Sequence, residues 1–306
     1  MPDSHAPYDA AIIGGGPAGL TCAIFLARYR RRVVVIDSAE PRNHSSRGIH
    51  GFLGYHDITP GELRKRGRAE AESFGAEMRD DRVLAIERAG DLFEVKLAGG
   101  ATLHARRIAL AYGVRDTLPD IPDLASYYGV SVHHCLDCDG YESRDKRMGI
   151  IGWQPKVVAV ALELLQWTDD VTIFTHGHAR EWDAEAQSKL LAETIGIKDE
   201  QILALEGEEG RVRNVVLSTG ERVPIEALFF NIDVKRACTL AETLGCLVDP
   251  KKADVQVDEH GKTTIEGVWA IGDLAKGSQL VVTAAADGAI AAISINKSLL
   301  PPSRVL

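Results

Sequence analysis

The sequence predicts an α/β protein in which one three-layer domain is inserted into another. Residues 9–38 and 147–176 share one plan, in which a short apolar strand leads through a glycine turn into a helix and a second apolar strand. Apolar strands that alternate with helices form parallel sheets covered on both faces. An apolar strand ending in glycine recurs late in the chain, at 267–273. We therefore expect two Rossmann-like nucleotide-binding domains, one made of residues 1–115 and 241–306 and the other, inserted, of residues 116–240.

The first segment and the residues after it predict most of the elements of the outer domain. Apolar spacing indicates a helix at 20–29 between buried strands at 10–13 and 33–36. A helix at 61–74 is expected to follow, with residues 57–60 as its cap and first turn. Alternating residues then predict strands at 83–86, 92–97 and 102–110, with a hairpin turn at 98–100. The Gly-, Pro- and Asp-rich stretch at 112–123 is typical of a crossing between domains.

Within the inserted domain, the second strand–helix–strand segment is expected to start near Gly149, and a helix is expected at 181–195. Strand-like segments follow at 202–205, 212–217 and 227–230. After residues 231–233 the chain should return to the outer domain, where a last helix is predicted at 279–299.

The glycine turn of the first segment fits the spacing Gly-x-Gly-x-x-Gly, with Pro17 and Ala18 between its last two glycines. Gly14 permits the tight turn, Gly16 lets backbone N–H groups approach a pyrophosphate, and Gly19 allows close packing of helix on strand. At the end of the next strand, Asp37 would accept hydrogen bonds from an adenosine ribose. The first segment is therefore predicted to bind a dinucleotide.

The glycine turn alone does not choose between FAD and NAD. The late strand ends in Gly272 and Asp273, and an aspartate in that place could bind the ribityl chain of a flavin. This second signal favours FAD.

Composition excludes several classes of protein. A formal net charge of -9 argues against a nucleic-acid partner. The sequence shows no secretory signal and no apolar run long enough to span a membrane, so a cytoplasmic protein is expected. Five cysteines without an export signal do not indicate a disulfide framework.

Cys135 and Cys138 form a Cys-x-x-Cys pair just before the second segment. Two thiols at this spacing can close a small disulfide ring and so accept and release an electron pair. Zinc would need further ligands, and Cys238 and Cys246 are poorly spaced for that role. A structural disulfide is typical of exported proteins. Redox chemistry without a metal is therefore the preferred interpretation.

At this point the chain resembles the low-molecular-weight thioredoxin reductase family. The resemblance rests on residues 14–19, 111–113, 135–140 and 267–273, the last followed by 284–288, and their order covers nearly the full length. It implies a homodimer with non-covalent FAD and a Cys pair on the inserted domain that exchanges electrons with a thiol or disulfide substrate. Further positions that it suggests for the cofactor are Arg42, Asn43, Val83, Ala111, Gly113 and Val281.

The resemblance also assigns roles around the Cys pair. Cys138 would face the flavin, and Cys135 would exchange with the substrate. Asp139 would be the acid–base group that protonates a leaving thiolate or the reduced flavin. Because an ordinary thiol has a pKa of about 8.5, something must favour the thiolate, and the adjacent His134 is the candidate.

The second segment carries an eroded copy of the glycine turn, offset by 138 positions. Gly152 corresponds to Gly14, but Gln154, Val157 and Thr175 replace Gly16, Gly19 and Asp37. The family, when it uses NADPH, places arginines after this strand. Here two histidines stand there, at 176 and 178, and only Arg180 could reach a phosphate. The inserted domain is thus predicted to have lost its nucleotide.

This departure makes the chain similar to a branch of thioredoxin-reductase-like proteins, the dithiol oxidases of the gliotoxin and holomycin type. Residues 132–135 and 140–142 resemble that branch, whereas Asp139 resembles the reductases. The preferred hypothesis is an oxygen-dependent oxidase of small dithiols that uses NADPH poorly or not at all. The alternatives are an NADPH- or ferredoxin-dependent reductase of thioredoxin-like disulfides and a non-catalytic flavin-binding sensor or interaction protein.

Overall fold

The computed structural model describes residues 6–230, 234–249, 254–275 and 277–304. These residues form two compact units. Unit 1 comprises the described parts of Met1–His44, Gly51–Asp116 and Val234–Leu306, and unit 2 those of Ser45–His50 and Thr117–Asp233. The expected return of the chain at 231–233 lies outside the described residues.

The units differ from the expected boundaries in two places. Residues 45–50 belong to unit 2, where the Arg47 guanidinium donates a hydrogen bond to the Glu209 carbonyl at 3.2 Å. Residues 234–240 belong to unit 1, because β16 (Val234–Arg236) pairs antiparallel with β7 (Val114–Asp116). Neither pairing leaves a local signal in the sequence.

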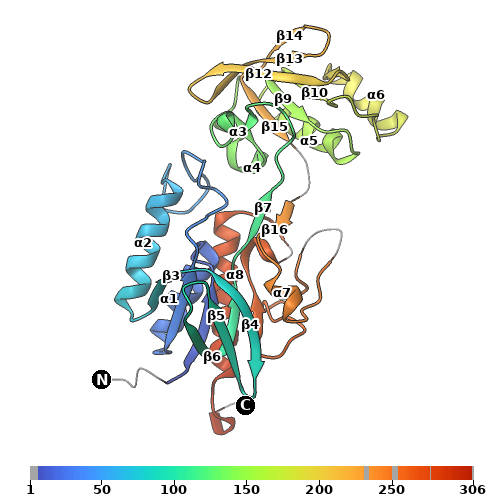
Figure 1. Ribbon diagram of the computed structural model, residues 1–306. Coiled ribbons are helices and arrows are strands. Elements are labelled where there is room, and N and C mark those ends of the chain that lie inside the picture. Colours follow the sequence, from blue (N-terminus) through green and yellow to red (C-terminus); the bar gives the residue numbers. More distant parts are fainter. Residues whose placement is uncertain (1–5, 231–233, 250–253, 276, 305–306) are drawn as a thin grey trace. The chain divides into compact units, whose positions relative to one another are not determined.

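The described residues of unit 1 form a seven-stranded sheet with helices packed on it (Figure 1). The two strands of the predicted strand–helix–strand segment pair in parallel near the centre of this sheet. The hairpin turn at residues 98–100 joins the antiparallel strands β5 and β6, as expected. In spatial order the strands are β3 (Glu77–Asp80), β2 (Val33–Asp37), β1 (Tyr8–Ile13), β6 (Thr102–Leu110), β5 (Leu92–Leu97) and β4 (Val83–Ala89), with β17 (Val268–Ala270) also beside β6.

The helices of unit 1 begin where their caps place them. Pro17 opens α1 (Pro17–Arg28), earlier than expected, because proline fits a first helical turn. Thr59 caps α2 (Pro60–Ser73) by accepting a hydrogen bond from the Glu62 N–H at 3.2 Å, as predicted. The last helix, α8 (Val281–Ser298), packs beside α1. Shorter elements are α7 (Leu240–Thr243) and the 3₁₀ turns η1 (Gly272–Leu274) and η2 (Pro302–Arg304).

Unit 2 contains a parallel five-stranded sheet and a separate antiparallel three-stranded sheet. The parallel strands are, in order, β11 (Gly196–Lys198), β10 (Val171–Phe174), β9 (Met148–Ile151), β15 (Ala227–Phe230) and β8 (Val132–His133). The antiparallel strands are β12 (Ile202–Glu208), β13 (Arg211–Leu217) and β14 (Arg222–Pro224). Its helices are α3 (Leu124–Tyr127), α4 (Leu136–Asp139), α5 (Lys156–Leu164) and α6 (Ala184–Ala192).

The helix expected at 181–195 is shorter than predicted. Asp183 caps α6 by accepting from the Ala186 N–H at 2.8 Å, so the helix starts later. The residues before it turn away because Arg180 binds Asp199 and the Trp182 indole donates to Gln187 at 3.0 Å.

The first two strands of each segment, β1 and β2 in unit 1 and β9 and β10 in unit 2, pair in the same register. Ile13 pairs with Ile36 in unit 1, and Ile151 pairs with Phe174 in unit 2, each pair being 138 positions from the other. The first glycine of each turn donates to the neighbouring strand in the same way, at 2.8 Å in unit 1 and 3.0 Å in unit 2. The two segments are therefore structural copies.

Alternate residues of the central strands bury opposite faces of each sheet. In unit 1, Ile12 and Val35 pack under α1 and α8, whereas Ile13 and Ile36 pack into a separate core on the other face. This arrangement confirms the predicted three-layer Rossmann-like α/β fold. None of the helices in the described ranges is long and apolar enough to cross a bilayer.

Candidate functional site

The glycine turn of unit 1 has the close contacts that its spacing predicts. Gly14 has a φ of +113°, and a Cβ there would lie 2.4 Å from the Ala111 carbonyl oxygen. A Cβ on Gly19 would lie 2.0 Å from the Gly14 oxygen, so only glycine lets α1 approach β1 this closely. A Cβ on Gly16, the N-cap of α1, would meet no atom within 4 Å. This open space at a helix N-terminus fits the diphosphate of FAD.

Asp37 lies at the end of β2, where a ribose-binding acid is expected. Its carboxylate forms an ion pair with Arg64 of α2, whose guanidinium also donates to the Gly15 carbonyl at 3.4 Å. A fixed positive charge thus lies at the edge of the glycine turn. Arg64 has no sequence signal of this role, because it lies in a largely polar helix and only the packing of α2 brings it to the turn.

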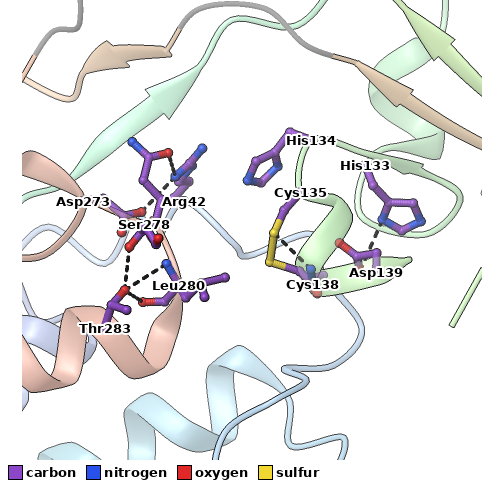
Figure 2. The surroundings of a disulfide bond; sticks show 12 residues. Arg42, His133, His134, Cys135, Cys138, Asp139, Asp273, Ser278, Leu280 and Thr283 are labelled. Carbon is purple, nitrogen blue, oxygen red and sulfur yellow. Dashed lines mark hydrogen bonds and ion pairs between the residues drawn. A yellow bond between two sulfur atoms is a disulfide. The ribbon is translucent and has the colours of Figure 1, made fainter. Parts of the chain in front are cut away.

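Two residues predicted separately for the cofactor, Arg42 and Asp273, meet in unit 1. The Arg42 guanidinium lies 2.8 Å from an Asp273 oxygen (Figure 2). It also lies 2.5 Å from an Asp116 oxygen and donates to Gln279 at 2.8 Å. Burial alone would lower the pKa of Arg42, but the two carboxylates outweigh it and raise that pKa. Arg42 is therefore a charged group that fixes the Gly272–Asp273 turn, and no sequence signal linked it to Asp116.

The remaining candidate positions also lie in unit 1. The Ala111 N–H donates to the Ile13 carbonyl at 2.8 Å, which places the 111–113 crossover beside the glycine turn. Gly113 has a φ of +65° and lets the chain leave that turn. Asn43 follows Arg42 in a turn, Val83 is the first residue of β4, and Val281 is the first residue of α8. Their contacts with FAD stay predictions.

Cys135 and Cys138 form a disulfide in unit 2, with their Cα atoms 5.3 Å apart. Cys135 is the N-cap of α4, and its sulfur accepts a hydrogen bond from the Cys138 N–H at 3.1 Å (Figure 2). A backbone donor aimed at a sulfur favours the thiolate over the thiol once the pair is reduced. The local fold therefore gives the Cys135 sulfur a backbone hydrogen-bond donor.

The adjacent histidines point to opposite sides of the chain (Figure 2). The buried ring of His133 in β8 packs against Phe229, with centroids 5.6 Å apart, and its Nδ1 lies 3.4 Å from an Asp139 oxygen. His134 turns the other way, where its Nδ1 lies 2.8 Å from the Tyr128 hydroxyl. Asp139 and His134 were predicted from the sequence, whereas their contacts with His133 and Tyr128 were not.

The eroded turn of unit 2 carries side chains where the turn of unit 1 has glycines. The indole of Trp153, at the position that corresponds to Gly15, stacks on the His178 imidazole with centroids 3.7 Å apart. The Glu181 N–H donates to the Trp153 carbonyl at 2.9 Å, which brings the loop after β10 onto the turn. The Gln154 side-chain oxygen is buried there without a hydrogen-bond partner in the described residues. Val157, on the buried face of α5, is fully buried in the core.

The residues after β10 are bound to one another. Arg180 binds Asp199 through two contacts, of 2.8 Å from Nε and 2.5 Å from Nη2, and its hydrogen bond lowers the pKa of Asp199. Thr175 is fully buried and its hydroxyl also donates to Asp199, at 3.4 Å. Burial, followed by the neighbouring His178, lowers the pKa of His176, which disfavours a positive charge at that position. The guanidinium that could have held a phosphate is thus engaged by a carboxylate.

The other cysteines are packed rather than exposed to reagents. Cys22 is completely buried in α1, and burial raises the pKa of its thiol to about 12. Cys246 is buried and donates to the Thr263 hydroxyl at 3.7 Å, and burial also raises the pKa of the half-buried Cys238. In the part of the chain that the structure describes, no group of three or more His, Cys, Asp or Glu side chains is placed to hold a metal ion.

Comparisons with known proteins agree with these features. A family model described as pyridine nucleotide-disulphide oxidoreductase matches residues 8–288. The thioredoxin reductase tcpT of Claviceps purpurea is 31% identical over 278 residues, which are 87% of this chain and 86% of that protein. The thioredoxin reductase of Treponema pallidum is 30% identical over 301 residues, 93% of this chain and 95% of that protein.

Solved structures give the same result for the whole chain. The crystal structure of HlmI matches with a TM-score of 0.91 at 37% identity, covering 96% of this chain and 92% of that one. An oxidoreductase from Agrobacterium tumefaciens matches with a TM-score of 0.90 at 33% identity, covering 97% and 100%. The chain therefore belongs to the pyridine nucleotide-disulphide oxidoreductase family, as a thioredoxin reductase-like enzyme that depends on FAD.

Proposed function

We propose that this protein is a dithiol oxidase that uses nicotinamide nucleotides poorly or not at all. A small dithiol would reduce the Cys135–Cys138 disulfide, and oxygen would be the final electron acceptor. The observation that carries the proposal is the Trp153–His178 stack: a tryptophan whose ring is engaged by the loop after β10 stands in the turn where a nicotinamide dinucleotide would need a glycine.

Two further features of unit 2 support the loss of the nucleotide. The Gln154 side chain, whose oxygen is buried, stands where the second glycine of the turn would be, and a side chain there keeps a pyrophosphate away from the backbone N–H groups. Arg180, which could otherwise bind a 2′-phosphate, is held by Asp199. A phosphate would have to displace that carboxylate before it could bind.

The Cys pair supports the thiol chemistry. A substrate thiolate would attack the Cys135 sulfur and break its bond to Cys138, which leaves as a thiolate. The second substrate thiolate would then attack the substrate sulfur of this mixed disulfide, releasing the cyclic disulfide product and the Cys135 thiolate. The substrate has then lost two electrons and the Cys pair has gained them. Bound FAD would take this electron pair and pass it to oxygen.

Residues of both units would serve these steps. In unit 1, Gly16, Asp37 and Asp273 would hold the cofactor's diphosphate, ribose and ribityl chain. In unit 2, Asp139, with His133 at 3.4 Å, would give or accept the proton that accompanies electron transfer. His134 would accept protons from thiols at Cys135.

A reductase of thioredoxin-like disulfides is the second candidate. Asp139 favours it, as do the relatives that are named thioredoxin reductases. Such an enzyme would take electrons from NADPH or ferredoxin. A flavin-binding sensor without turnover is disfavoured, because binding alone needs neither the Cys pair nor Asp139. From the family we also propose a homodimer, which sedimentation of the purified protein would test. We propose a cytoplasmic location as well, which fractionation of the cells that make the protein would test.

One anaerobic experiment separates these functions. The purified FAD-loaded protein is mixed first with NADPH and then with a small dithiol while the flavin absorbance is followed, and air is admitted last. We expect bleaching by the dithiol only, with recovery in air. Rapid bleaching by NADPH would contradict the oxidase, and bleaching by neither donor would favour the binding protein or a ferredoxin-dependent enzyme.

A variant of the Cys pair tests the electron path. Cys138→Ser should abolish bleaching by the dithiol and keep bound FAD. The matched control is Cys238→Ser, since Cys238 lies in unit 1 and packs against the core of that unit. Bleaching that persists in Cys138→Ser would refute the assigned role.

A further inference from the structure

Arg64 of α2 joins two parts of the cofactor site that is predicted in unit 1. Its Nε donates to the Gly15 carbonyl at 3.4 Å, and its Nη2 donates to the Asp37 carboxylate. One planar guanidinium thus links the backbone of the glycine turn to the acid at the end of β2. The side chains of Arg64 and Asp37 are only 18% and 12% exposed, so solvent screens their ion pair less than a pair on the open surface.

The packing of α2 on α1 brings Arg64 to this place. Arg64, Gly67 and Ala71 follow one another at spacings of three and four residues, and so lie on one side of α2. Ala71 is fully buried in a core to which α1 also contributes, and a Cβ on Gly67 would lie 3.0 Å from a methyl group of Leu20 in α1. The small residues let the two helices approach. Arg64, one turn nearer the start of α2, then lies beside the turn that precedes α1.

The Asp37 carboxylate lies directly against the glycine turn. A Cβ on Gly15 would lie 2.6 Å from its Oδ2, which is the oxygen that accepts from Arg64. The other oxygen, Oδ1, accepts from the Ala39 N–H at 3.3 Å. A carboxylate can accept about four hydrogen bonds, so an acid held by these donors can still accept from the hydroxyls of a ribose. Arg64 therefore sets the orientation of Asp37 without using up its acceptor capacity.

We propose that Arg64 is a positioning residue for Asp37 in the recognition of the adenosine ribose of FAD. The two arms of one rigid fork bind Gly15 and Asp37, and so hold the carboxylate where the ribose hydroxyls can donate to it. An aspartate without this anchor would have to lose rotamer freedom when the ribose binds, which weakens binding. The inference rests on the role proposed above for Asp37 and not on the donor or acceptor of the electrons.

The test measures how well the protein distinguishes a ribose from a deoxyribose. The full-length protein is freed of FAD, and ADP and 2′-deoxy-ADP are compared as competitors of FAD binding, which is followed by flavin fluorescence. ADP carries the diphosphate and the adenosine ribose of FAD, and the two nucleotides differ by one hydroxyl group. Because that hydroxyl donates to a charged acceptor, the wild type should prefer ADP by about tenfold.

Substitution of Arg64 should remove most of this preference. In Arg64→Met the carboxylate loses its anchor, and the preference for ADP should fall to about twofold. Arg64→Lys keeps the positive charge but not the fork, so it should lower the preference as well. Arg66→Met is the matched control, since Arg66 lies on the same helix but pairs with Glu62 at 2.7 Å, and it should keep the preference of the wild type.

The ratio of the two affinities separates positioning from other roles. An unchanged ratio in Arg64→Met would overturn the proposal even if both nucleotides bound more weakly, because Arg64 would then act on the diphosphate. A full preference in Arg64→Lys, or an equal loss in Arg66→Met, would overturn it too. An unchanged circular dichroism spectrum shows that a variant is folded, and Arg64→Lys decides the question if Arg64→Met does not fold.

The wild type tests the role on which the inference rests. If it bound ADP and 2′-deoxy-ADP equally, the assignment of Asp37 to the ribose would fail, and the inference about Arg64 with it. A wild type that discriminates, beside an Arg64→Met variant that discriminates equally well, would refute the role of Arg64 alone. The competition requires neither a dithiol, nor NADPH, nor oxygen, so its result holds for an oxidase and for a reductase.

Discussion

The indole of Trp153 and the imidazole of His178 stack in unit 2 with centroids 3.7 Å apart and planes 15° from parallel. Trp153 corresponds to Gly15 of unit 1, in the turn that approaches a dinucleotide. The same backbone plan thus has a glycine in one copy and a stacked pair of rings in the other. The energy of that stack stabilises a closed turn, where an intact copy would leave room for a phosphate.

His178→Ala should therefore destabilise the protein. Because an aromatic pair contributes about 0.5–1.5 kcal/mol beyond its buried area, we expect the free energy of unfolding to fall by about 1 kcal/mol in urea titrations that follow Trp fluorescence. His56→Ala is the control, since that side chain is 89% exposed, and it should leave the value unchanged. Equal effects of the two substitutions would show that the stack contributes nothing.

The sequence predicted those features whose cause is local. The spacing of Gly14, Gly16 and Gly19 follows from backbone geometry within a few residues, so the turn and its open face could be inferred. The 138-position offset of the two copies could be inferred as well, because strand length and turn position repeat. The Cys135–Cys138 disulfide follows from a spacing of three residues.

The sequence could not predict contacts that depend on packing. Arg64 reaches Asp37 from a different helix, and Arg42 joins Asp116 to Asp273 across most of the chain. His178 is 25 residues from Trp153, and a histidine carries no local sign of its stacking partner. Each of these contacts forms only when two elements meet in the folded unit, so residue type alone could not reveal it.

The glycines of the first turn should separate folding from cofactor binding. Gly19→Ala places a Cβ 2.0 Å from the Gly14 oxygen and should lower the free energy of unfolding of the FAD-free protein by about 1–3 kcal/mol. Gly16→Ala meets no atom, so it should change that stability by less than about 1 kcal/mol. It should nevertheless weaken FAD binding about tenfold or more, because the methyl group occupies the space for the diphosphate.

Urea unfolding and flavin-fluorescence titration measure the two effects. Gly61→Ala is the control: its Cβ is also unobstructed, so FAD binding should not change, and the free energy of unfolding should rise by no more than about 1 kcal/mol, because alanine is favoured over glycine in the helix α2. If Gly16→Ala bound FAD as tightly as the wild type, the diphosphate would have to bind elsewhere.

Cys22 should make the protein less stable in alkali. Burial raises its pKa to about 12, above the ordinary 9.0, so the folded state keeps a proton that the unfolded state loses. The contribution of Cys22 to the free energy of unfolding is therefore fully present below pH 9. It falls by about 1.4 kcal/mol per pH unit as the pH rises toward 12. Cys22→Ala removes this proton, so the free energy of unfolding should decline less steeply between pH 8 and pH 11. Urea titrations at several pH values measure it. A slope equal to that of the wild type would show that other groups cause the decline.

Arg42 should matter far more for stability than an exposed arginine. Its side chain is 12% exposed and that of Asp116 only 6%, so Arg42→Leu leaves two carboxylates without their cation in a poorly solvated place. Breaking one side of a buried pair costs about 3–5 kcal/mol, and we expect a loss of that size in urea unfolding. Arg66 offers the comparison, since it pairs with Glu62 at 2.7 Å but is 55% exposed, and Arg66→Leu should leave stability unchanged. If the two variants unfolded alike, the Arg42 cluster would be an ordinary surface ion pair, and the Gly272–Asp273 turn would need another anchor.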